Sequence, residues 1–418
     1  MHEDILIRSP GLRPVGESFL LPHAAVTTEI GLFLPSSPVF TVGVTGSDGK
    51  STTASLAAAI LRESGRRVFL GGNIGTPLLP MISDMQRGDI AVVELSSFQL
   101  YDTVASPDTG VITNITPNHL NWHKDLAEYT AAKENIFRKR RSPPSVDCFF
   151  PVKPTRAVLS ASDGETPRIL STVECPVLFS ATESYAALSY RYGSVAATVI
   201  EDGILRFYTG NGRENDAVAD ISAFRPSGLH ERMNLCAAVA VTYGIADGDA
   251  VSRAIGAAER LPHRMERIGT LRGVTYYDSA VDSSPLRTRV TLSALVSETG
   301  KRPIVIAGGA RKGIPLLPLA DTLLTYARAA VLVGDTAEEI GCLLRNASAS
   351  FPVCIAADME AAVLTAASLA GEGDGVILSP ACTSFDRYAS FREKAADFRR
   401  AVMLLAEAEN TKTKENDI

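Results

Sequence analysis

The segment with the most informative chemistry is Gly46-Ser47-Asp48-Gly49-Lys50-Ser51-Thr52, which lies where a strand-like run passes into a helix-like run. Backbone N–H groups at such a turn can face a phosphate, while Lys50 supplies positive charge and Ser51 can reach a magnesium ion. The spacing is not the full GxxxxGK[ST] pattern, because residue 44 is Val. With strand, Gly-Lys-Ser and helix in register, the segment predicts a nucleotide-binding loop, and a purely structural turn is the alternative.

Glu94 closes the apolar run 89–95, directly before a polar stretch. A carboxylate at the C-terminal end of a sheet strand lies on the edge where such folds bind ligands, and Mg²⁺ prefers oxygen donors. The alternative is a strand-end Glu that points into solvent.

A polar cluster from Asn114 to His123 directly follows another apolar run, and Lys133 falls in the helix-like segment 127–137. A lone His is usually a packed or surface residue, and a helix Lys is usually solvated. Their position beside a phosphate loop is what makes His119 and Lys133 candidates.

The elements that must position these residues form an alternating pattern. Strand-like runs at 39–46, 66–72, 89–95 and 110–116 are separated by segments long enough for crossover helices. The pattern predicts a central α/β domain with a mostly parallel, helix-covered sheet. Between residues 142 and 227 the runs are shorter and carry hairpin signals, which predicts β additions to this domain.

A second α/β series begins near Leu261. Its strand-like runs lie at 274–280, 302–310, 327–335, 351–357 and 375–381. The series predicts a separate, Rossmann-like C-terminal domain. We therefore expect a central P-loop-type ATPase domain at 37–260, the C-terminal domain at 261–408 and a polar tail at 409–418. Residues 1–36 are too few to bury a core of their own.

Composition restricts the class of partner. The 418 residues carry 41 Lys plus Arg against 47 Asp plus Glu, a formal charge of −6, without a long basic run, so nucleic acid is not expected. Six cysteines lie far apart without a CxxC pair, which fits reduced thiols in a cytosol. The N-terminus lacks a signal-peptide pattern and no run reaches the ~18 apolar residues of a membrane span. We expect a cytoplasmic monomer that acts on small molecules.

Motifs in a fixed order along the chain resemble those of the Mur ligase family. They extend from Val39 to Phe398 and include GVTGSDGKSTT, GGNIGTPLL, VVELSSFQL, NITPNHLNWH, AEYTAAKENIF, GLHERMNLCAA, PHRMERIG, YYDS, IAGGARKG and LSPACTSFDRYASFREKAADF. The SPGL and EIGLF pieces before them look like the end of the family's first domain, which carries a uridine-nucleotide site. The resemblance implies an ATP-dependent ligase that adds D-glutamate to a UDP-muramoyl-alanine precursor in peptidoglycan synthesis.

The resemblance also assigns an ATP site. It implies that residues 46–52 hold the triphosphate of ATP and its Mg²⁺, with Glu94 sharing that ion. His119 matches a ligand of a second Mg²⁺, and Lys133 matches a lysine that is carbamylated to hold the same ion. A carbamate converts a cationic amine into an oxygen ligand suited to Mg²⁺. The remaining nucleotide contacts implied are Asn234, Arg264 and Asp278.

Two groups of substrate contacts follow from the same resemblance. Asn73, Ser96 and Ser97 match contacts to the muramoyl peptide. Lys312, Ser384 and Phe391 match the pocket of the incoming D-glutamate, where a cation and a hydroxyl would bind carboxylates. For Arg264, the alternative to a nucleotide contact is a surface ion pair.

Several positions depart from the family pattern. The resemblance implies that residues 1–36 are the remnant of the family's UDP-binding N-terminal domain, truncated at its start. Asn118 stands where Asp is usual, and Glu231 stands where Asn is common. The family motif DSK[AG]TN has Ala280 in place of the lysine and Asp282 in place of the threonine. An added carboxylate would repel a dicarboxylate substrate. A sibling ligase with another amino acid or acceptor, and a weakened homologue that only binds nucleotide, therefore remain as alternatives.

Overall fold

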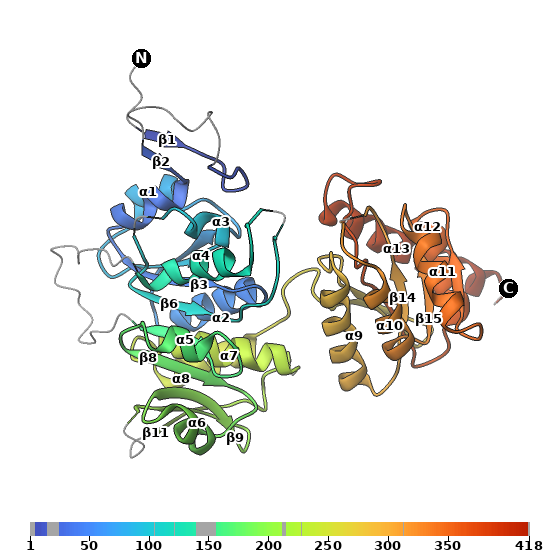
Figure 1. Ribbon diagram of the computed structural model, residues 1–418. Coiled ribbons are helices and arrows are strands. Elements are labelled where there is room, and N and C mark those ends of the chain that lie inside the picture. The colour runs from blue at the N-terminus through green and yellow to red at the C-terminus, as the bar shows by residue number, and fades with distance from the viewer. Residues whose placement is uncertain are drawn as a thin grey trace. The chain divides into compact units, whose positions relative to one another are not determined.

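The structure is a computed structural model, and it describes residues 5–14, 25–103, 105–120, 122–138, 156–210, 215–226, 228–311 and 313–416. The chain divides into two compact units, Met1–Glu259 and Arg260–Ile418, each with its own sheet and core (Figure 1).

A nine-stranded sheet forms the centre of the first unit, in the order β11-β10-β9-β8-β7-β6-β3-β5-β4. Seven of these strands are parallel: β3 (Phe40–Thr45), β4 (Val68–Gly72), β5 (Ile90–Glu94), β6 (Thr109–Ile112), β7 (Ala157–Ser160), β8 (Pro176–Ser180) and β9 (Ala196–Glu201). The antiparallel strands β10 (Ile204–Tyr208) and β11 (Asn215–Asp220) extend it at one edge. The prediction of a mostly parallel sheet with β additions is confirmed.

The turn between β9 and β10 shows why that extension forms. Asp202 and Gly203 both have positive φ, 51° and 75°, which matches the twist that a two-residue hairpin loop needs.

Helices cover both faces of this sheet (Figure 1). One face packs against α2 (Lys50–Glu63), α7 (Leu229–Thr242) and α8 (Gly248–Ala257). The other packs against α1 (Glu29–Ser36), α3 (Ser97–Leu100), α4 (Leu126–Arg138), α5 (Thr166–Leu170) and α6 (Tyr185–Tyr192). Strands such as β3 are buried along nearly their whole length, as expected for parallel strands between two helical layers.

Crossover helices are shorter than expected at two points. Between β4 and β5 there is a 3-10 helix, η2 (Leu79–Asp84), and between β5 and β6 the helix α3 has only 4 residues. The polar stretch after Glu94 forms a tight capped turn, so the site loops on this edge are short.

Two short parallel strands, β1 (Ile5–Ile7) and β2 (Ala25–Thr27), precede α1. The buried Arg8 ties this part to the first unit, because its guanidinium donates to both oxygens of Asp102 at 2.9 Å and to the Phe98 carbonyl. A bidentate pair of this kind fixes orientation as well as distance.

The second unit has a six-stranded sheet in the order β12-β13-β17-β14-β15-β16. Five strands fall in the predicted runs: β13 (Val274–Asp278), β14 (Ile304–Ala307), β15 (Ala329–Leu332), β16 (Val353–Ile355) and β17 (Gly375–Leu378). An edge strand absent from the prediction, β12 (Glu266–Leu271), pairs antiparallel with β13.

Helices again lie on both faces of this sheet. α12 (Met359–Leu369) and α13 (Phe391–Asn416) pack on one face, and α9 (Pro285–Thr299), α10 (Leu317–Tyr326) and α11 (Ala337–Ala347) pack on the other. The predicted Rossmann-like arrangement is confirmed for this unit.

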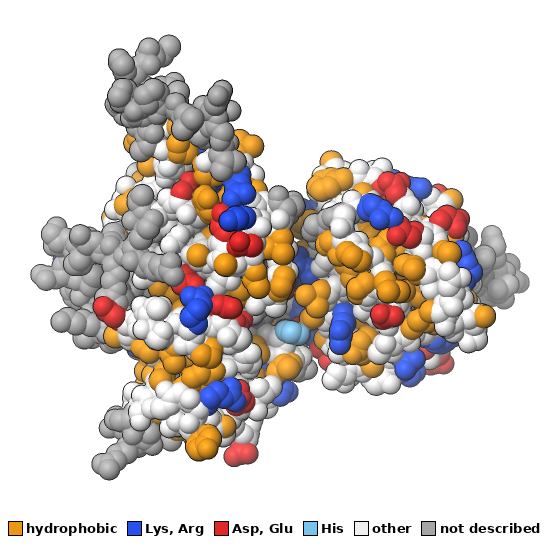
Figure 2. Space-filling view, in the orientation of Figure 1, with side chains coloured by type: hydrophobic (Ala, Val, Ile, Leu, Met, Phe, Trp, Pro, Cys, Tyr) orange, Lys and Arg blue, Asp and Glu red, His pale blue; other side chains and the backbone are white. Residues whose placement is uncertain are grey.

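On the face shown in Figure 2, basic and acidic side chains of the described residues are interspersed. Among the described residues, no helix is long and apolar enough to cross a membrane.

Candidate active site

The phosphate loop adopts a conformation that only glycine tolerates at two points. Gly46 has φ 149° and Gly49 has φ 80°. A Cβ added at Gly46 would lie 1.8 Å from the Thr113 hydroxyl, so the close approach of two strand ends requires glycine. Thr113 and Asn114, at the end of β6, then hold the loop: the Asn114 side chain accepts from Asp48 N at 3.0 Å and donates to Asp48 O at 3.0 Å.

Two lysines share one carbonyl of this loop. Lys50 Nζ donates to Gly46 O at 2.8 Å and to Ser47 O at 2.9 Å, and Lys133 Nζ donates to the same Gly46 O at 2.8 Å. Lys133 is only 1% exposed. Burial, and secondly the charge of Lys50, lower the pKa of Lys133 well below its usual value. Proximity to Lys50 and burial both favour the neutral amine.

Glu94 ends β5 beside the predicted substrate contact Asn73. Asn73 Nδ2 donates to Glu94 Oε1 at 2.8 Å, and Asn73 N donates to the Glu94 carbonyl at 2.8 Å. Glu94 is 2% exposed, and its other oxygen, Oε2, is buried without a hydrogen-bond partner. An unsatisfied buried carboxylate oxygen is costly unless a ligand compensates it.

Of the predicted magnesium ligands, the buried Glu94 has the free oxygen that such an ion would need. The unpaired Glu94 oxygen is a hard donor, and its charge acts on the Lys133 amine. Ser51 and Thr52 lie in the first turn of α2, directly after Lys50. His119 is exposed, has a left-handed backbone with φ 56°, and packs against Phe98 with ring centroids 4.9 Å apart.

The hydroxyls of Ser96 and Ser97 are engaged within the protein. Ser96 Oγ caps α3 by accepting from Gln99 N at 3.2 Å, and Ser96 N donates to Gln99 Oε1 at 2.9 Å. Ser97 is 2% exposed, and its Oγ lies 2.9 Å from His123 Nε2. Both serines thus organise the turn after Glu94.

Asn234, on α7, lies against the phosphate loop. A Cβ at Gly49 would be 2.3 Å from Asn234 Oδ1, and Thr53 Oγ1 donates to the same oxygen at 3.3 Å. The predicted nucleotide contact is therefore adjacent to the loop, and it gives a second reason for glycine at position 49.

Asp278 in the second unit is enclosed by partners. It is 0% exposed, and its Oδ2 accepts from Arg399 Nε at 3.0 Å and lies 2.8 Å from His263 Nδ1. Arg399 also pairs with Glu266 at 2.6 Å. His263, Glu266 and Asp278 are near enough to one another to hold a metal ion, but the Arg399 guanidinium already supplies the positive charge.

The remaining predicted residues of the second unit lie near the carboxyl edge of its sheet. Arg264 follows His263 and is half-buried; Ser384 is buried in the loop after β17; Phe391 begins α13, and its ring packs edge-on against His263 at 5.8 Å. Lys312 lies outside the described residues.

Asp282, the departure at the amino-acid end, points into its own unit. It is 4% exposed, and Ser379 Oγ donates to its Oδ2 at 2.8 Å. Burial raises the pKa of Asp282, while neighbouring hydroxyls of Ser279 and Ser379 partly offset that rise. Ala280 is also buried. The added carboxyl is therefore part of an internal hydroxyl cluster.

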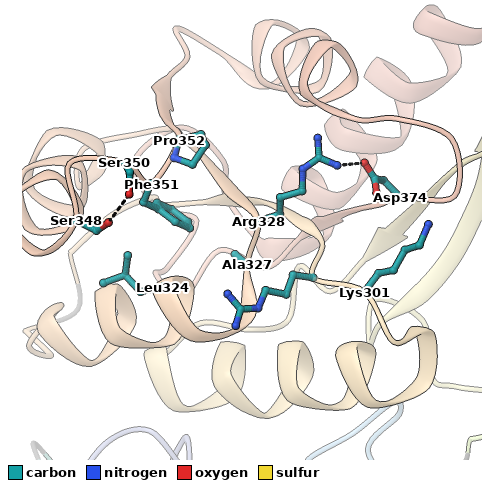
Figure 3. A pocket seen from close by; sticks show the side chains of 10 residues that line it. Lys301, Leu324, Ala327, Arg328, Ser348, Ser350, Phe351, Pro352 and Asp374 are labelled. Carbon is teal, nitrogen blue, oxygen red and sulfur yellow. Dashed lines mark hydrogen bonds and ion pairs between the residues drawn. The ribbon is translucent and has the colours of Figure 1, made fainter.

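A further pocket lies away from these residues. Its volume is about 690 Å³, and it is lined by residues that precede β14, β15, β16 and β17, at the amino edge of the second sheet: Lys301, Arg302, Arg328, Phe351, Pro352 and Asp374 among them (Figure 3). Arg328 already pairs with Asp374 there (Figure 3). None of the predicted site residues lines it, and open parallel sheets bind ligands at the opposite, carboxyl edge.

A phosphate loop at the carboxyl edge of one parallel sheet, followed by a second Rossmann-like unit, defines the class of protein. The profile of the Mur ligase middle domain matches residues 44–242, and that of the Mur ligase glutamate ligase domain matches residues 263–382. The chain belongs to the Mur ligase family.

Curated relatives extend this similarity over nearly the whole chain. UDP-N-acetylmuramoylalanine--D-glutamate ligase of Symbiobacterium thermophilum is 35% identical over 96% of this chain and 84% of its own length. The enzyme of the same name from Acetivibrio thermocellus is 33% identical over 96% and 82%. The MurF ligase of Thermotoga maritima, solved in complex with ADP, shares the fold with a TM-score of 0.62 at 16% identity, covering 96% of this chain and 94% of that one.

Sequence reasoning missed three residues that organise the site. Thr113 donates to Asp48 O at 2.5 Å, Tyr129 OH lies 2.9 Å from Ser47 Oγ, and His123 contacts Ser97. Tyr129 carried a signal, because it lies one helical turn before Lys133 and therefore on the same face of α4. Thr113 and His123 depend on contacts between distant segments, which no local pattern reveals.

Proposed function

We propose that this chain is an ATP-dependent ligase that joins D-glutamate to UDP-N-acetylmuramoyl-L-alanine, releasing ADP and phosphate. The relatives named UDP-N-acetylmuramoylalanine--D-glutamate ligase support this reaction. The observation that carries it is the cluster on the first sheet, where Lys50 and the buried Lys133 meet at Gly46 O beside the unpaired Glu94 oxygen. Such an arrangement suits a triphosphate that brings its own negative charge.

The reaction has two steps. The terminal carboxylate of the precursor attacks the γ-phosphorus of ATP, forming an acyl phosphate and releasing ADP. The D-glutamate amine then attacks the acyl carbon, and phosphate leaves with the bond electrons. Lys50 Nζ would exchange its hydrogen bonds to the loop carbonyls for bonds to the phosphate oxygens of ATP. It would then stabilise the negative charge that accumulates on these oxygens.

Magnesium ions, when bound, would neutralise phosphate charge and align the reacting oxygens. Ser51 and Glu94 would hold one ion, while His119 and a carbamylated Lys133 would hold the other. The depressed pKa of Lys133 supports carbamylation, because only a neutral amine adds CO₂.

The other predicted residues keep their assigned roles in this proposal. Asn234, Arg264 and Asp278 would contact ATP; Asn73, Ser96 and Ser97 would contact or frame the muramoyl peptide; Lys312, Ser384 and Phe391 would receive D-glutamate. Asp278 acts through a fixed network, since its carboxylate is already bonded to Arg399 and His263.

A sibling ligase with a different amino acid is the second candidate, and Ala280 with Asp282 is the observation in its favour. The structure weakens the objection to D-glutamate. Asp282 bonds to Ser379 inside the unit, and its raised pKa reduces the negative charge that a dicarboxylate would meet.

We place the reaction in the cytoplasm and propose that the protein acts as a monomer on small molecules. The free cysteines among the described residues (Cys175, Cys236, Cys342, Cys354 and Cys382) are compatible with a reducing compartment.

The decisive experiment measures ADP release by the purified protein with ATP, Mg²⁺, UDP-N-acetylmuramoyl-L-alanine and one amino acid at a time. D-glutamate should give the highest kcat/KM, and L-glutamate and D-aspartate serve as matched controls. A preference for another amino acid would support the sibling ligase. A rate of ADP release that does not depend on any added amino acid would contradict the ligase proposal.

A further inference from the structure

His123 is a buried histidine that neither the metal site nor the substrate assignments use. It is 1% exposed, although His119, one turn earlier, is exposed. Its ring packs against Trp122 at 4.6 Å and Tyr129 at 5.2 Å between centroids, and lies nearly parallel to Phe98. Burial of an imidazole among aromatic rings is costly unless its nitrogens have partners.

The side chain of His123 reaches one site segment, and its backbone reaches another. Nε2 lies 2.9 Å from Ser97 Oγ, three residues after Glu94. The His123 N–H donates to the His119 carbonyl at 2.9 Å and so closes the turn in which His119 has its left-handed φ of 56°. One residue therefore links the segment after β5 to the segment after β6.

The surroundings of Nδ1 select the tautomer. Nδ1 has no hydrogen-bond partner in the described structure, but it faces Glu128 Oε2 at 3.5 Å. Arg13 holds that carboxylate at 2.7 Å. A carboxylate favours the proton on the facing nitrogen, so Nδ1 carries it and Nε2 accepts from the Ser97 hydroxyl.

A third link connects the ring to the phosphate loop. Tyr129, which packs edge-on against His123, places its hydroxyl 2.9 Å from Ser47 Oγ. Ser47 Oγ also donates to Thr116 O at 2.9 Å. The ring thus contacts the segments after β5 and β6 directly, and it reaches the phosphate loop through Tyr129 of α4.

We propose that His123 is a positioning residue of the ligase: through Nε2 it fixes the Ser97 hydroxyl against the His119 turn, and so aligns the part of the site that receives the carboxylate of the muramoyl peptide. The inference rests on the proposed function. Misplacing reacting groups by about 1 Å can cost ~10²-fold in rate, whereas ATP contacts the loop and should bind normally.

Three substitutions separate the hydrogen bond from packing. In His123→Gln the amide oxygen can take the place of Nε2 as acceptor of the Ser97 hydroxyl. In His123→Asn the shorter amide reaches only the place of Nδ1, and His123→Phe keeps an aromatic ring without nitrogens. With the precursor and D-glutamate, we expect kcat of His123→Gln within ~5-fold of wild type. His123→Asn and His123→Phe should lose ~10–100-fold in kcat, with KM for ATP changed less than ~3-fold.

A double-mutant cycle with Ser97→Ala tests the pair directly. If the two side chains act together, Ser97→Ala/His123→Phe should be no slower than the worse single variant, whereas independent roles would multiply the losses. Wild-type kcat in His123→Phe, multiplicative losses, or equal losses in all three variants together with a lowered Tm would each overturn the proposal.

The assigned tautomer has its own readout, which does not depend on ligase activity. In ¹⁵N-histidine-labelled protein, His123 should show a protonated Nδ1 and an unprotonated Nε2 whose signal moves on Ser97→Ala. A protonated Nε2 would overturn the inference. Absence of amino-acid-dependent ADP release by wild type would instead contradict the proposed function.

Discussion

The charged side chains at the carboxyl edges of the two sheets differ in whether they have partners within the protein. In the first unit, Glu94 Oε2 is buried without a partner, and Lys50 and Lys133 crowd one carbonyl. In the second unit, Arg399 pairs with Asp278, and Asp282 is bonded within a hydroxyl cluster. The Glu94 oxygen without a partner is available to a charged ligand. Buried charged groups that bond to one another, as in the second unit, stabilise the fold instead.

This difference predicts which unit's buried charged groups affect turnover and which unit's affect stability. In the proposed function, ATP and its metal ions compensate the unpaired carboxylate oxygen and the two close lysines of the first unit. Its site residues should therefore matter more to turnover than to folding. In the second unit the buried acids Asp278 and Asp282 already have partners within the unit, so they should matter more to stability than to turnover. Four substitutions test this contrast, from the largest expected effect to the smallest.

Lys50→Ala should abolish ligation, by ~10³-fold or more in kcat/KM, while the fold stays intact. The Lys50 amine donates to two loop carbonyls, and in the proposed mechanism its loss removes charge stabilisation during phosphoryl transfer. Steady-state ADP release and Tm measure the two halves of the prediction. Lys301→Ala, at the amino edge of the second sheet, is the matched control and should behave as wild type. Near-normal turnover of Lys50→Ala would remove the loop from the mechanism.

Lys133→Met should lose most activity and yet stabilise the ligand-free protein by about 1–3 kcal/mol, because an apolar chain of similar size removes a buried amine whose desolvation opposes folding. Denaturant unfolding and ADP release are the measurements. The pKa of Lys133 is lowered in the folded protein, so folding at neutral pH must remove a proton that the lysine carries in the unfolded chain, which opposes folding. This penalty disappears as the pH rises toward the ordinary pKa of lysine. The stabilisation by Lys133→Met should therefore shrink at higher pH.

The proposed carbamate has a separate test. Lys133→Ala should be inactive, and a small carboxylate in the buffer should restore part of its activity by taking the vacant ligand position. Lys133→Ala with normal turnover in the absence of additives would contradict the carbamate.

Arg399→Met should destabilise the second unit by about 3 kcal/mol, since it leaves the buried Asp278 carboxylate without its main cation. Titration with an ATP analogue should still show nucleotide binding by the first unit. Arg400→Met is the matched control, because its side chain is 64% exposed and pairs only with Asp397 among the described residues. Equal stability of the two variants would show that Asp278 does not need its partner.

Asp282→Asn should have the smallest effect, a stabilisation of about 1 kcal/mol at pH 7. The raised pKa of the buried carboxyl means that ionisation opposes folding increasingly as pH rises above the ordinary Asp value. The gain should thus vanish near pH 4, which thermal unfolding at the two pH values would show. A loss of stability at pH 7 would indicate that the ionised form is the one the hydroxyls prefer.

Local pattern was sufficient for much of the fold. The five strands predicted after Leu261 and the strand-to-helix turn at Gly46 were found because apolar runs and glycine spacing act over a few residues. The edge strand β12 was missed because it alternates between half-buried and exposed residues and lacks a strong apolar run. The segments on either side of β5 are long enough for crossover helices, but they contain only η2 and the short α3, a detail that length alone did not predict.

The sequence by itself determined the family, and it predicted the phosphate loop and the candidate site residues, because these follow from residue types at short spacing. Only the tertiary structure decided which charges remain unsatisfied. Whether Lys133 is neutral, whether Glu94 keeps a free oxygen, and whether Asp282 faces a substrate or its own unit depend on burial and on partners far away in the chain. Desolvation is a property of the surrounding volume, and a linear pattern does not contain it.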